Sequence, residues 1–230
     1  MNSKIDKVFK AQVAGEIQRY EDIAIIIKDL ISHNVELSTE ERNLFIFAYK
    51  NLMNNLRIAF HNLSDFQKNK CPNDNTISLV GTYKENIRRD ANCICNEAIA
   101  LIDDKLLPTT NNDDHKTFYL KFKGDLYRYY CEFLTGEQLK ITSTKSNDSY
   151  ITAIKAAEAL PAVNPIKLGL LLNYSVYLSD VQSNPKEACK IAQAAYNDAM
   201  AGIDQNGGNQ HQETIYILQI LRDVTLWNDE

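Results

Sequence analysis

The stretch from Phe118 to Glu132 reads FYLKFKGDLYRYYCE. It is dense in aromatic side chains, which favour burial, yet it also contains Lys121, Asp125 and Arg128 besides the terminal Glu132. These four side chains are spaced i, i+4, i+7 and i+11, so on a helix they form one polar stripe. Burying charges is costly unless they are paired or hydrogen-bonded. The stripe therefore indicates either a network of ion pairs or one side of a groove that receives a charged ligand.

The bulk composition is that of an ordinary globular protein with few chain breakers. Of the 230 residues, 44% are hydrophobic and 24% are charged, and there are only eight glycines and five prolines. A chain of this size can bury a substantial core, and the scarcity of turn residues favours long helices. The formal net charge of -5 gives no support to nucleic-acid binding, which requires a strongly basic face. It is still compatible with a local basic pocket.

The sequence contains no targeting or metal-binding pattern. No apolar run approaches the roughly eighteen residues of a membrane-spanning helix, and the N-terminal MNSKIDKVFK carries charges throughout. We therefore expect no membrane insertion and no secretory leader. The five cysteines form neither a CxxC pair nor a Cys/His cluster with zinc spacing, so we expect free thiols, no metal site and no cofactor. The expected location is the cytoplasm, with the nucleus as a second compartment.

Motifs of catalysis are also missing. None of the four histidines lies in the context of a nucleophilic serine or cysteine, and the chain has no Gly-rich phosphate loop and no HExxH. These are the usual local patterns of hydrolases, nucleotide-binding enzymes and metalloproteases. We therefore expect a protein without enzymatic activity.

Apolar periodicity predicts an all-α fold of nine helices without strands, arranged as one domain over residues 1–230. The segment 19–32 is rich in β-branched residues and could form a strand on its own, but its acidic flanks and helical context favour a helix. The expected helices are about 4–18, 19–32, 38–68, 77–107, 116–134, 150–159, 165–181, 185–203 and 212–227.

Several helix starts carry explicit signals. Ser38 and Glu41 form a capping box, in which each side chain can bond to the backbone N–H of the other residue. Asn164 and Asn184 are each followed by a proline, which is the pattern of an N-cap before a first-turn proline. Residues 137–149 are mostly polar, and we expect them to form a loop.

Two more helices carry a narrow polar line like that of 118–132. In the third helix the line consists of Lys50, Asn54, Arg57 and His61; in the helix after Asn164 it consists of Asn173, Tyr177 and Asp180, with Leu172 and Val176 beside it. One such line is usually a solvated face. Three lines in one all-helical domain, two of them with Lys and Arg, suggest a shared concave groove.

Four segments resemble those of one known family. RNLFIFAYKN (42–51), FYLKFKGDLYRYY (118–130), NPIKLGLLLNYSV (164–176) and LQILRDVTLW (218–227) are similar to the corresponding segments of the 14-3-3 proteins. The resemblance covers essentially the whole chain in order. It implies nine antiparallel helices in a cup-shaped single domain with a concave amphipathic groove. It further implies a non-enzymatic adaptor, usually dimeric, that binds phosphoserine or phosphothreonine segments of client proteins.

The resemblance also assigns roles to individual residues. The expected phosphate-binding residues are Lys50, Arg57, Arg128 and Tyr129. The expected peptide-binding residues are Lys121, Asn173, Leu172, Val176, Asp180, Ile220 and Leu226. Guanidinium groups match a phosphate bidentately, a lysine adds a point charge, and a tyrosine hydroxyl can donate a further bond. Asp125 and Glu132 would orient the cations and offset their mutual repulsion when no ligand is bound.

The last helix departs from the family pattern. Arg222 to Trp227 reads RDVTLW, one residue shorter than the usual RDNLTLW. The slot of the family's second backbone-binding asparagine is therefore occupied by Val224 or Asp223, and neither offers an amide. A deletion inside a helix also rotates everything beyond it by about 100°. The expectation is either weaker or altered peptide binding or a displaced last helix. The alternative function is a helical scaffold for unphosphorylated partners.

The surface expected to form the dimer is altered as well. Its residues by resemblance are Val13, Ile17, Arg19, Asp22, Tyr83, Asn86 and Asp90. Asn86 replaces a lysine and Ile17 replaces a small residue, so one ion pair is missing and a larger side chain must fit in a self-complementary contact. We expect a homodimer that is weaker than usual, with a monomer as the alternative. In the third helix, His61 is either a partly exposed polar side chain or a pH-sensitive substitute for an arginine.

Overall fold

The computed structural model describes residues 3–33, 36–71, 73–205 and 212–226. All regular secondary structure in these ranges is helical and none of it is strand, which confirms the all-α prediction. α4, the π-helical segment η1 and α5 follow one another without a break, so the described residues form nine continuous helical segments. No helix in the described part of the chain is long and apolar enough to cross a membrane.

The chain divides into two compact units, which are described one at a time. Unit 1 comprises Met1–Thr110 and Tyr129–Thr135, and unit 2 comprises Asn111–Arg128 and Gly136–Glu230. Helix α6 (Asp113–Cys131) therefore supplies residues to both units. The expectation of a single domain over residues 1–230 stays a prediction.

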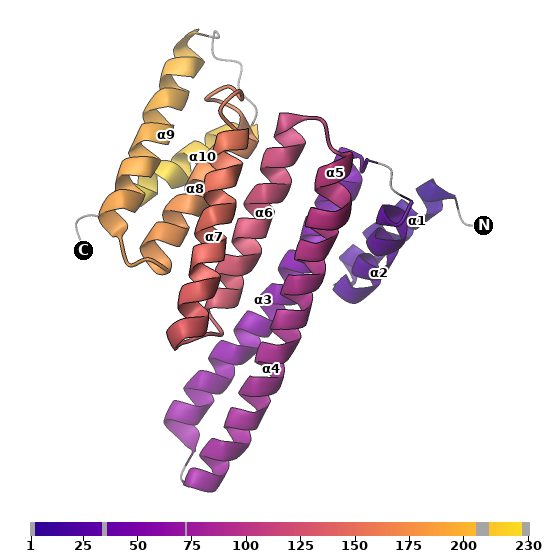
Figure 1. Ribbon diagram of the computed structural model, residues 1–230, viewed down its shortest axis with the longest axis vertical. Helices are drawn as coiled ribbons and strands as arrows, with labels where there is room; N and C mark the ends of the chain where they lie inside the picture. Colours follow the sequence, from indigo (N-terminus) through magenta and orange to yellow (C-terminus); the bar gives the residue numbers. More distant parts are fainter. Residues whose placement is uncertain (1–2, 34–35, 72, 206–211, 227–230) are drawn as a thin grey trace. The chain divides into compact units, whose positions relative to one another are not determined.

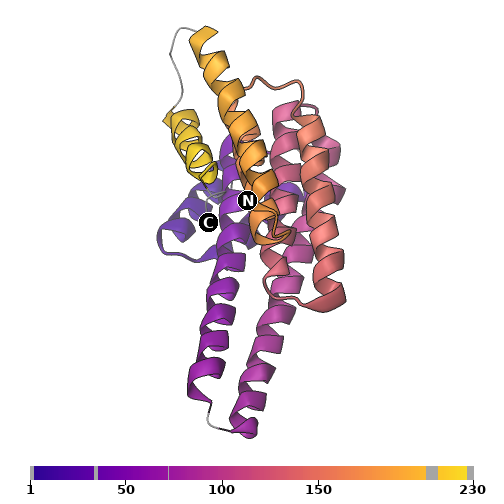
Figure 2. The same cartoon turned by 90° about the vertical axis from the view of Figure 1, so that its left-hand side faces the viewer.

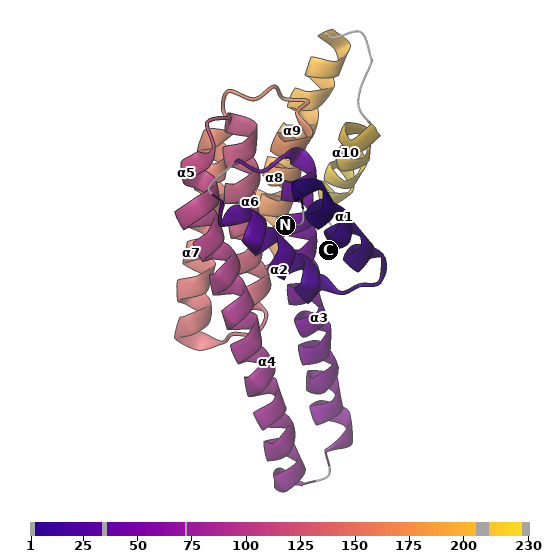
Figure 3. The same cartoon turned by 90° about the vertical axis from the view of Figure 1, so that its right-hand side faces the viewer.

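Unit 1 is built from the first helices of the chain. They are α1 (Lys4–Glu16), α2 (Tyr20–Ile31), α3 (Thr39–Lys70), α4 (Asp74–Leu101), η1 (Ile102–Leu106) and α5 (Leu107–Thr109). α3 and α4 are long and lie side by side in opposite directions (Figures 1 and 2). α2 packs on α3, and α1 packs on α2 (Figure 3). The buried side chains at the centre of this unit are Ile23, Ile27, Phe45, Tyr49 and Met53.

The starts of α3 and α4 are set by capping residues. The predicted capping box of α3 is confirmed, because Ser38 N donates to Glu41 Oε2 at 2.8 Å and Glu41 N donates to Ser38 Oγ at 3.3 Å. α4 begins three residues before the expected Ile77, because Asn73 Oδ1 accepts a hydrogen bond from Thr76 N at 3.0 Å. Both caps satisfy backbone donors that a helix start leaves without partners.

Unit 2 contains most of α6 together with four further helices. They are α7 (Gly136–Ala156), α8 (Pro165–Asp180), α9 (Pro185–Gln205) and α10 (Gln212–Val224). The predicted cap of α8 is confirmed, since Asn164 Oδ1 accepts from the backbone N–H groups of Ile166 and Lys167 at 2.9 and 3.2 Å. α8, α9 and α10 pack around one cluster of buried residues that includes Leu168 and Leu221.

The prediction of a loop over residues 137–149 is wrong. α7 runs through this segment as one helix (Figure 1). The hydroxyl groups that made the segment look like a loop are satisfied inside the structure: Ser149 Oγ donates to the Lys145 carbonyl at 2.7 Å, and Ser146 Oγ donates to the Gly124 carbonyl at 3.0 Å. A hydroxyl bonded in this way can be buried on a helix without an unpaired polar group. Polar composition therefore did not distinguish a solvated loop from a closely packed helix.

Candidate functional site

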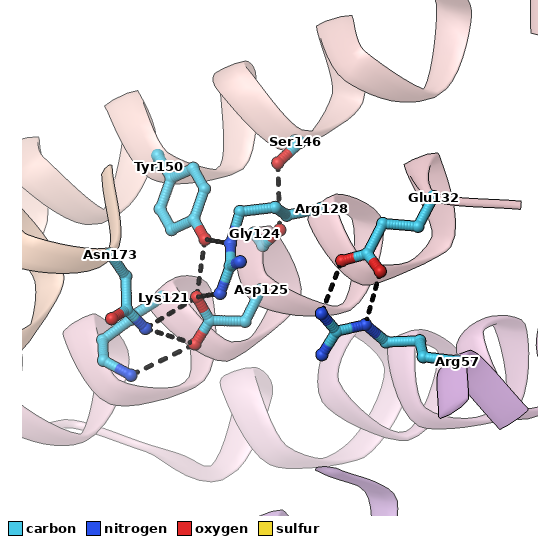
Figure 4. A network of polar contacts seen from close by, with 9 residues as sticks. All are labelled: Arg57, Lys121, Gly124, Asp125, Arg128, Glu132, Ser146, Tyr150 and Asn173. Carbon is cyan, nitrogen blue, oxygen red and sulfur yellow. Dashed lines mark hydrogen bonds and ion pairs between the residues drawn. The ribbon is translucent and has the colours of Figure 1, made fainter. Parts of the chain in front are cut away.

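The centre of the polar stripe in unit 2 is the carboxylate of Asp125 (Figure 4). Asp125 is 3% exposed and lies on α6 between Lys121 and Arg128. Lys121 Nζ is 3.2 Å from Asp125 Oδ2, and Arg128 Nη2 is 3.9 Å from Asp125 Oδ1. The i, i+4 and i+3 spacings bring these groups together on one face of the helix. One buried carboxylate is thus the shared counter-ion of two cations.

Two other helices complete the coordination of this carboxylate. Asn173 of α8 donates its amide Nδ2 to both oxygens of Asp125, at 2.8 and 2.9 Å. Tyr150 of α7 donates its hydroxyl to Asp125 Oδ1 at 2.5 Å and accepts from Arg128 Nε at 3.3 Å. Asp125, with its partners Lys121, Arg128, Tyr150 and Asn173, is called the Asp125 network below. Its groups hold one another in fixed orientations, as in other fully connected buried polar networks.

The charges of this network determine its protonation states. Burial raises the pKa of Asp125, but the charges of Lys121 and Arg128 together with the hydrogen bonds from Tyr150 and Asn173 outweigh this effect, so the net pKa is lowered. Burial, and then the negative charge of Asp125, raise the pKa of the Tyr150 hydroxyl well above its usual value. At neutral pH Asp125 is therefore an anion and Tyr150 a neutral donor.

Gly124 explains how α7 can approach α6 so closely. A Cβ atom at this position would lie 2.8 Å from ring atoms of Tyr150, closer than packed side chains tolerate. The Gly124 carbonyl also accepts the hydrogen bond from Ser146, one turn before Tyr150 on α7. The glycine and the serine together place the Tyr150 hydroxyl beside Asp125 and Arg128 (Figure 4).

Unit 1 contains a second polar cluster, centred on Glu132. Arg57 of α3 binds this carboxylate with two parallel contacts, Nη2 to Oε1 at 2.6 Å and Nε to Oε2 at 2.9 Å (Figure 4). The Arg57 guanidinium also lies over the Tyr129 ring, 4.7 Å from its centroid, which adds a cation–π contact. His61 Nε2 is 2.9 Å from the same Oε2. Arg57, His61 and Glu132 are called the Glu132 cluster below.

The Glu132 carboxylate stays ionised at neutral pH. Burial raises its pKa, but the hydrogen bonds and charges of Arg57 and His61 outweigh this effect, so the net pKa is lowered. Bidentate Arg–carboxylate pairs are among the stronger and more directional contacts in proteins. Glu132 therefore holds the Arg57 side chain in one orientation.

Lys50 has a different environment from the other predicted phosphate-binding residues. It is exposed on α3, two turns before Arg57 on the same helix face. Within the described ranges it has no ion-pair partner. An ammonium group without a carboxylate can bind an anion without first breaking an existing pair.

The structure places the predicted peptide-binding side chains at varied depths in unit 2. Leu172, Val176 and Ile220 are half-buried, whereas Asp180 and Leu226 are exposed. Asn173 is the member of this set that joins Lys121 in the Asp125 network. The shortened end of α10 also has a definite structure: Val224 is 1% exposed and packs in the core of unit 2, while Asp223 faces solvent. Trp227 lies outside the described residues.

The residues predicted to form a dimer surface lie at the surface of unit 1. Val13, Ile17 and Tyr83 are exposed to 47%, 63% and 66%. Arg19 pairs with Asp22 on α2 of the same chain, with Nε 2.5 Å from Oδ2. Asn86 and Asp90 are also exposed on α4, and the Asn86 side chain accepts a hydrogen bond from Arg89.

Tyr150, Gly124 and Ser146 are the members of the site that sequence reasoning missed. The sequence predicts a helix over about 150–159, whereas α7 begins at Gly136, so neither Ser146 nor the packing of Tyr150 against α6 could be inferred. Ser146 and Tyr150 are four residues apart, so they lie on the same face if the segment is read as one helix. This spacing is the signal by which sequence could have identified them. The described residues contain no group of three or more His, Cys, Asp or Glu side chains that could hold a metal ion.

Comparison with known proteins adds the family context. A family model described as 14-3-3 protein matches residues 10–228 of the chain. The 14-3-3 protein homolog 1 of Schistosoma mansoni is 38% identical over 227 residues, which cover 98% of this chain and 90% of the relative. The 14-3-3 protein theta of Homo sapiens is 34% identical over 229 residues, which cover 99% of this chain and 94% of the relative.

Proposed function

Because the chain belongs to the 14-3-3 family, we propose that it is a protein-binding adaptor that recognises phosphoserine or phosphothreonine in its clients. The phosphate would be bound by Lys50, Arg57, Arg128 and Tyr129. The adaptor would act in signalling, in the cytoplasm and the nucleus, by binding rather than by catalysis.

The Asp125 network is the observation that carries this proposal. Two cations share one buried carboxylate, and the network fixes Arg128 through Tyr150 before any ligand arrives. A phosphate carries about -1.5 to -2 charges at pH 7 and has three acceptor oxygens. Since Arg128 is already oriented, a phosphate would bind it with little further loss of side-chain entropy. Hydrogen bonds to charged groups contribute about 1.5–3 kcal/mol each, so a few of them could supply most of the roughly 8 kcal/mol of a micromolar complex.

Asn173 is positioned to contribute to the same binding event. Its Nδ2 group is engaged by Asp125, and this contact orients its Oδ1 away from the carboxylate (Figure 4). An amide oxygen held in this way can accept a backbone N–H of an extended peptide. Leu172 and Val176, on the same helix, would contact the apolar side chains of that peptide.

The test is a pair of fluorescently labelled peptides that differ only in one phosphate. We expect fluorescence polarisation to give micromolar or tighter binding of the phosphopeptide and at least tenfold weaker binding of its twin. Arg128→Glu should abolish the difference, while Lys190→Glu, an exposed α9 residue outside both polar clusters, should preserve it. Equal binding of the two peptides would refute phosphate dependence.

A second candidate function rests on the end of α10. The shortened helix buries Val224 in the core of unit 2, so this position offers no amide to a ligand backbone. If the remaining contacts with a ligand were apolar, the chain would be a scaffold for unphosphorylated partners. The same peptide pair separates the two functions, because such a scaffold would bind both peptides alike.

A further inference from the structure

The Glu132 carboxylate binds two basic side chains, Arg57 and His61, in different ways. Arg57 uses Nε and Nη2, so both oxygens of the carboxylate are occupied by one edge of the guanidinium. The opposite edge of Arg57 is not engaged by Glu132, and a guanidinium has five N–H donors in total. His61 approaches Glu132 Oε2 from one turn further along α3. The cluster therefore consists of a fixed cation, Arg57, and a titratable imidazole, His61, which both contact the Glu132 carboxylate.

The His61 imidazole can hold this position in two protonation states. A neutral ring with its proton on Nε2 donates one hydrogen bond to Glu132 and brings no charge. A protonated ring makes the same hydrogen bond and adds a positive charge. The formal charge of the Glu132 cluster then changes from zero to one positive unit without any change of geometry.

The location of His61 makes this change relevant to an anion bound at Arg57. Lys50, Arg57 and His61 are spaced i, i+7 and i+11 on α3, so they lie along one face of the helix. The His61 side chain is 58% exposed and can exchange protons with solvent. Asp65 is the next charged residue along α3, one turn later, and Lys84 of α4 lies over the ring of the adjacent Phe60.

We propose that His61 is a pH-dependent positioning residue of the phosphate site, which strengthens anion binding when its ring is protonated. The protonated ring adds a positive charge beside Arg57 and partly neutralises Glu132, and both effects favour a phosphate. Glu132 remains ionised over the range in which imidazoles ordinarily titrate, about pH 5 to 8. This inference rests on the proposed function, because it needs a phosphate bound at Arg57.

The experiment compares the intact chain with His61→Gln, which keeps a hydrogen-bond donor but cannot become charged. The affinity for one labelled phosphopeptide is measured between about pH 8 and pH 5.5, a range that spans ordinary imidazole titration. The phosphate itself titrates near pH 6, but its effect is common to both proteins and cancels in the ratio of their dissociation constants. At the alkaline end we expect the two proteins to bind the phosphopeptide with nearly equal dissociation constants. At the acid end we expect the unaltered protein to bind about two- to fivefold more tightly than His61→Gln, which is the size of an exposed charge contact.

Two further variants make the result specific. His33→Gln, on an exposed histidine at the end of α2, should follow the unaltered protein at every pH. His61→Arg should bind at least as tightly as the unaltered protein at the alkaline end and show no extra gain in acid. A flat ratio between the unaltered protein and His61→Gln would overturn the inference. Failure of the unaltered protein to prefer the phosphopeptide at any pH would overturn the proposed function instead.

Discussion

At the scale of single residues, Asp125 is the group on which the polar stripe depends. It is buried, and each of its partners is a cation or a hydrogen-bond donor. Pairing of this kind explains how charged side chains can lie inside an aromatic helix. It also means that removal of the carboxylate leaves Lys121 and Arg128 partly buried without their shared counter-ion.

We expect Asp125→Ala to lower the free energy of unfolding by about 3–5 kcal/mol, the usual cost of breaking a buried ion pair from one side. Urea denaturation, monitored by circular dichroism, measures this decrease in the free energy of unfolding. Asp198→Ala, an exposed carboxylate on α9, is the matched control and should stay within about 0.5 kcal/mol of the unaltered protein. A loss below about 1 kcal/mol at Asp125 would contradict a structural role for the network.

The lowered pKa values of Asp125 and Glu132 predict sensitivity to acid. A carboxyl group whose pKa is lower in the folded state stabilises the fold above its unfolded pKa, which is ordinarily about 4. This stabilisation is lost as the pH falls from the unfolded-state pKa through the lower pKa of the folded state. We expect the unfolding free energy to decrease across this window, and Glu132→Gln to reduce the slope. An unchanged slope in this variant would show that Glu132 does not contribute to the acid response.

At the scale of helices, the close packing of α7 on α6 is what brings Tyr150 to Arg128. Gly124 permits this approach, because any Cβ atom there would meet the Tyr150 ring at 2.8 Å. Gly81 provides a natural comparison: it lies within α4, and a Cβ atom there would meet nothing within 4 Å.

Replacing each of the two glycines by alanine should change the stability of the protein in opposite directions. Gly124→Ala is expected to destabilise the protein by about 1–3 kcal/mol through overpacking and to weaken phosphopeptide binding by displacing Tyr150. Gly81→Ala should stabilise it by about 0.5–1 kcal/mol, since alanine favours a helix interior. Thermal unfolding and the polarisation assay measure both effects. A neutral Gly124→Ala would contradict the close α6–α7 contact.

At the scale of the whole molecule, the exposed apolar side chains of unit 1 support the expected homodimer. Val13, Ile17 and Tyr83 are each about half or more exposed in the single chain. Burial of one such side chain contributes about 1.5–3 kcal/mol, and a two-fold interface contains each of them twice. The proposal is that these residues meet their counterparts in a second copy of the chain.

Sedimentation velocity tests this proposal. We expect a dimer at micromolar concentration and at least a tenfold weaker association for Ile17→Glu, because a charge would be buried in each half of the contact. Ile141→Glu, an equally apolar exposed position on α7 of unit 2, is the control and should leave the association unchanged. A monomer at all concentrations for the unaltered chain would refute the dimer.

Much of the molecule could be inferred from local sequence. Apolar periodicity predicts most of the helices, and short-range capping bonds determine their starts at Ser38 and Asn164, because both signals act within one or two turns. The polar stripe of α6 follows from spacing alone for the same reason. That Lys121, Asp125 and Arg128 share a helix face was therefore predictable.

What tertiary structure alone decided is which groups from other helices meet that stripe. In the helix at 137–149, the Ser146 hydroxyl is buried because it finds a backbone acceptor on α6. The Tyr150 hydroxyl joins Asp125 because Gly124 lets two helices pack closely, and Glu132 binds both Arg57 and His61 because a distant segment of the chain packs on α3. Such contacts depend on the packing of residues far apart in the chain, which local propensity and spacing do not encode.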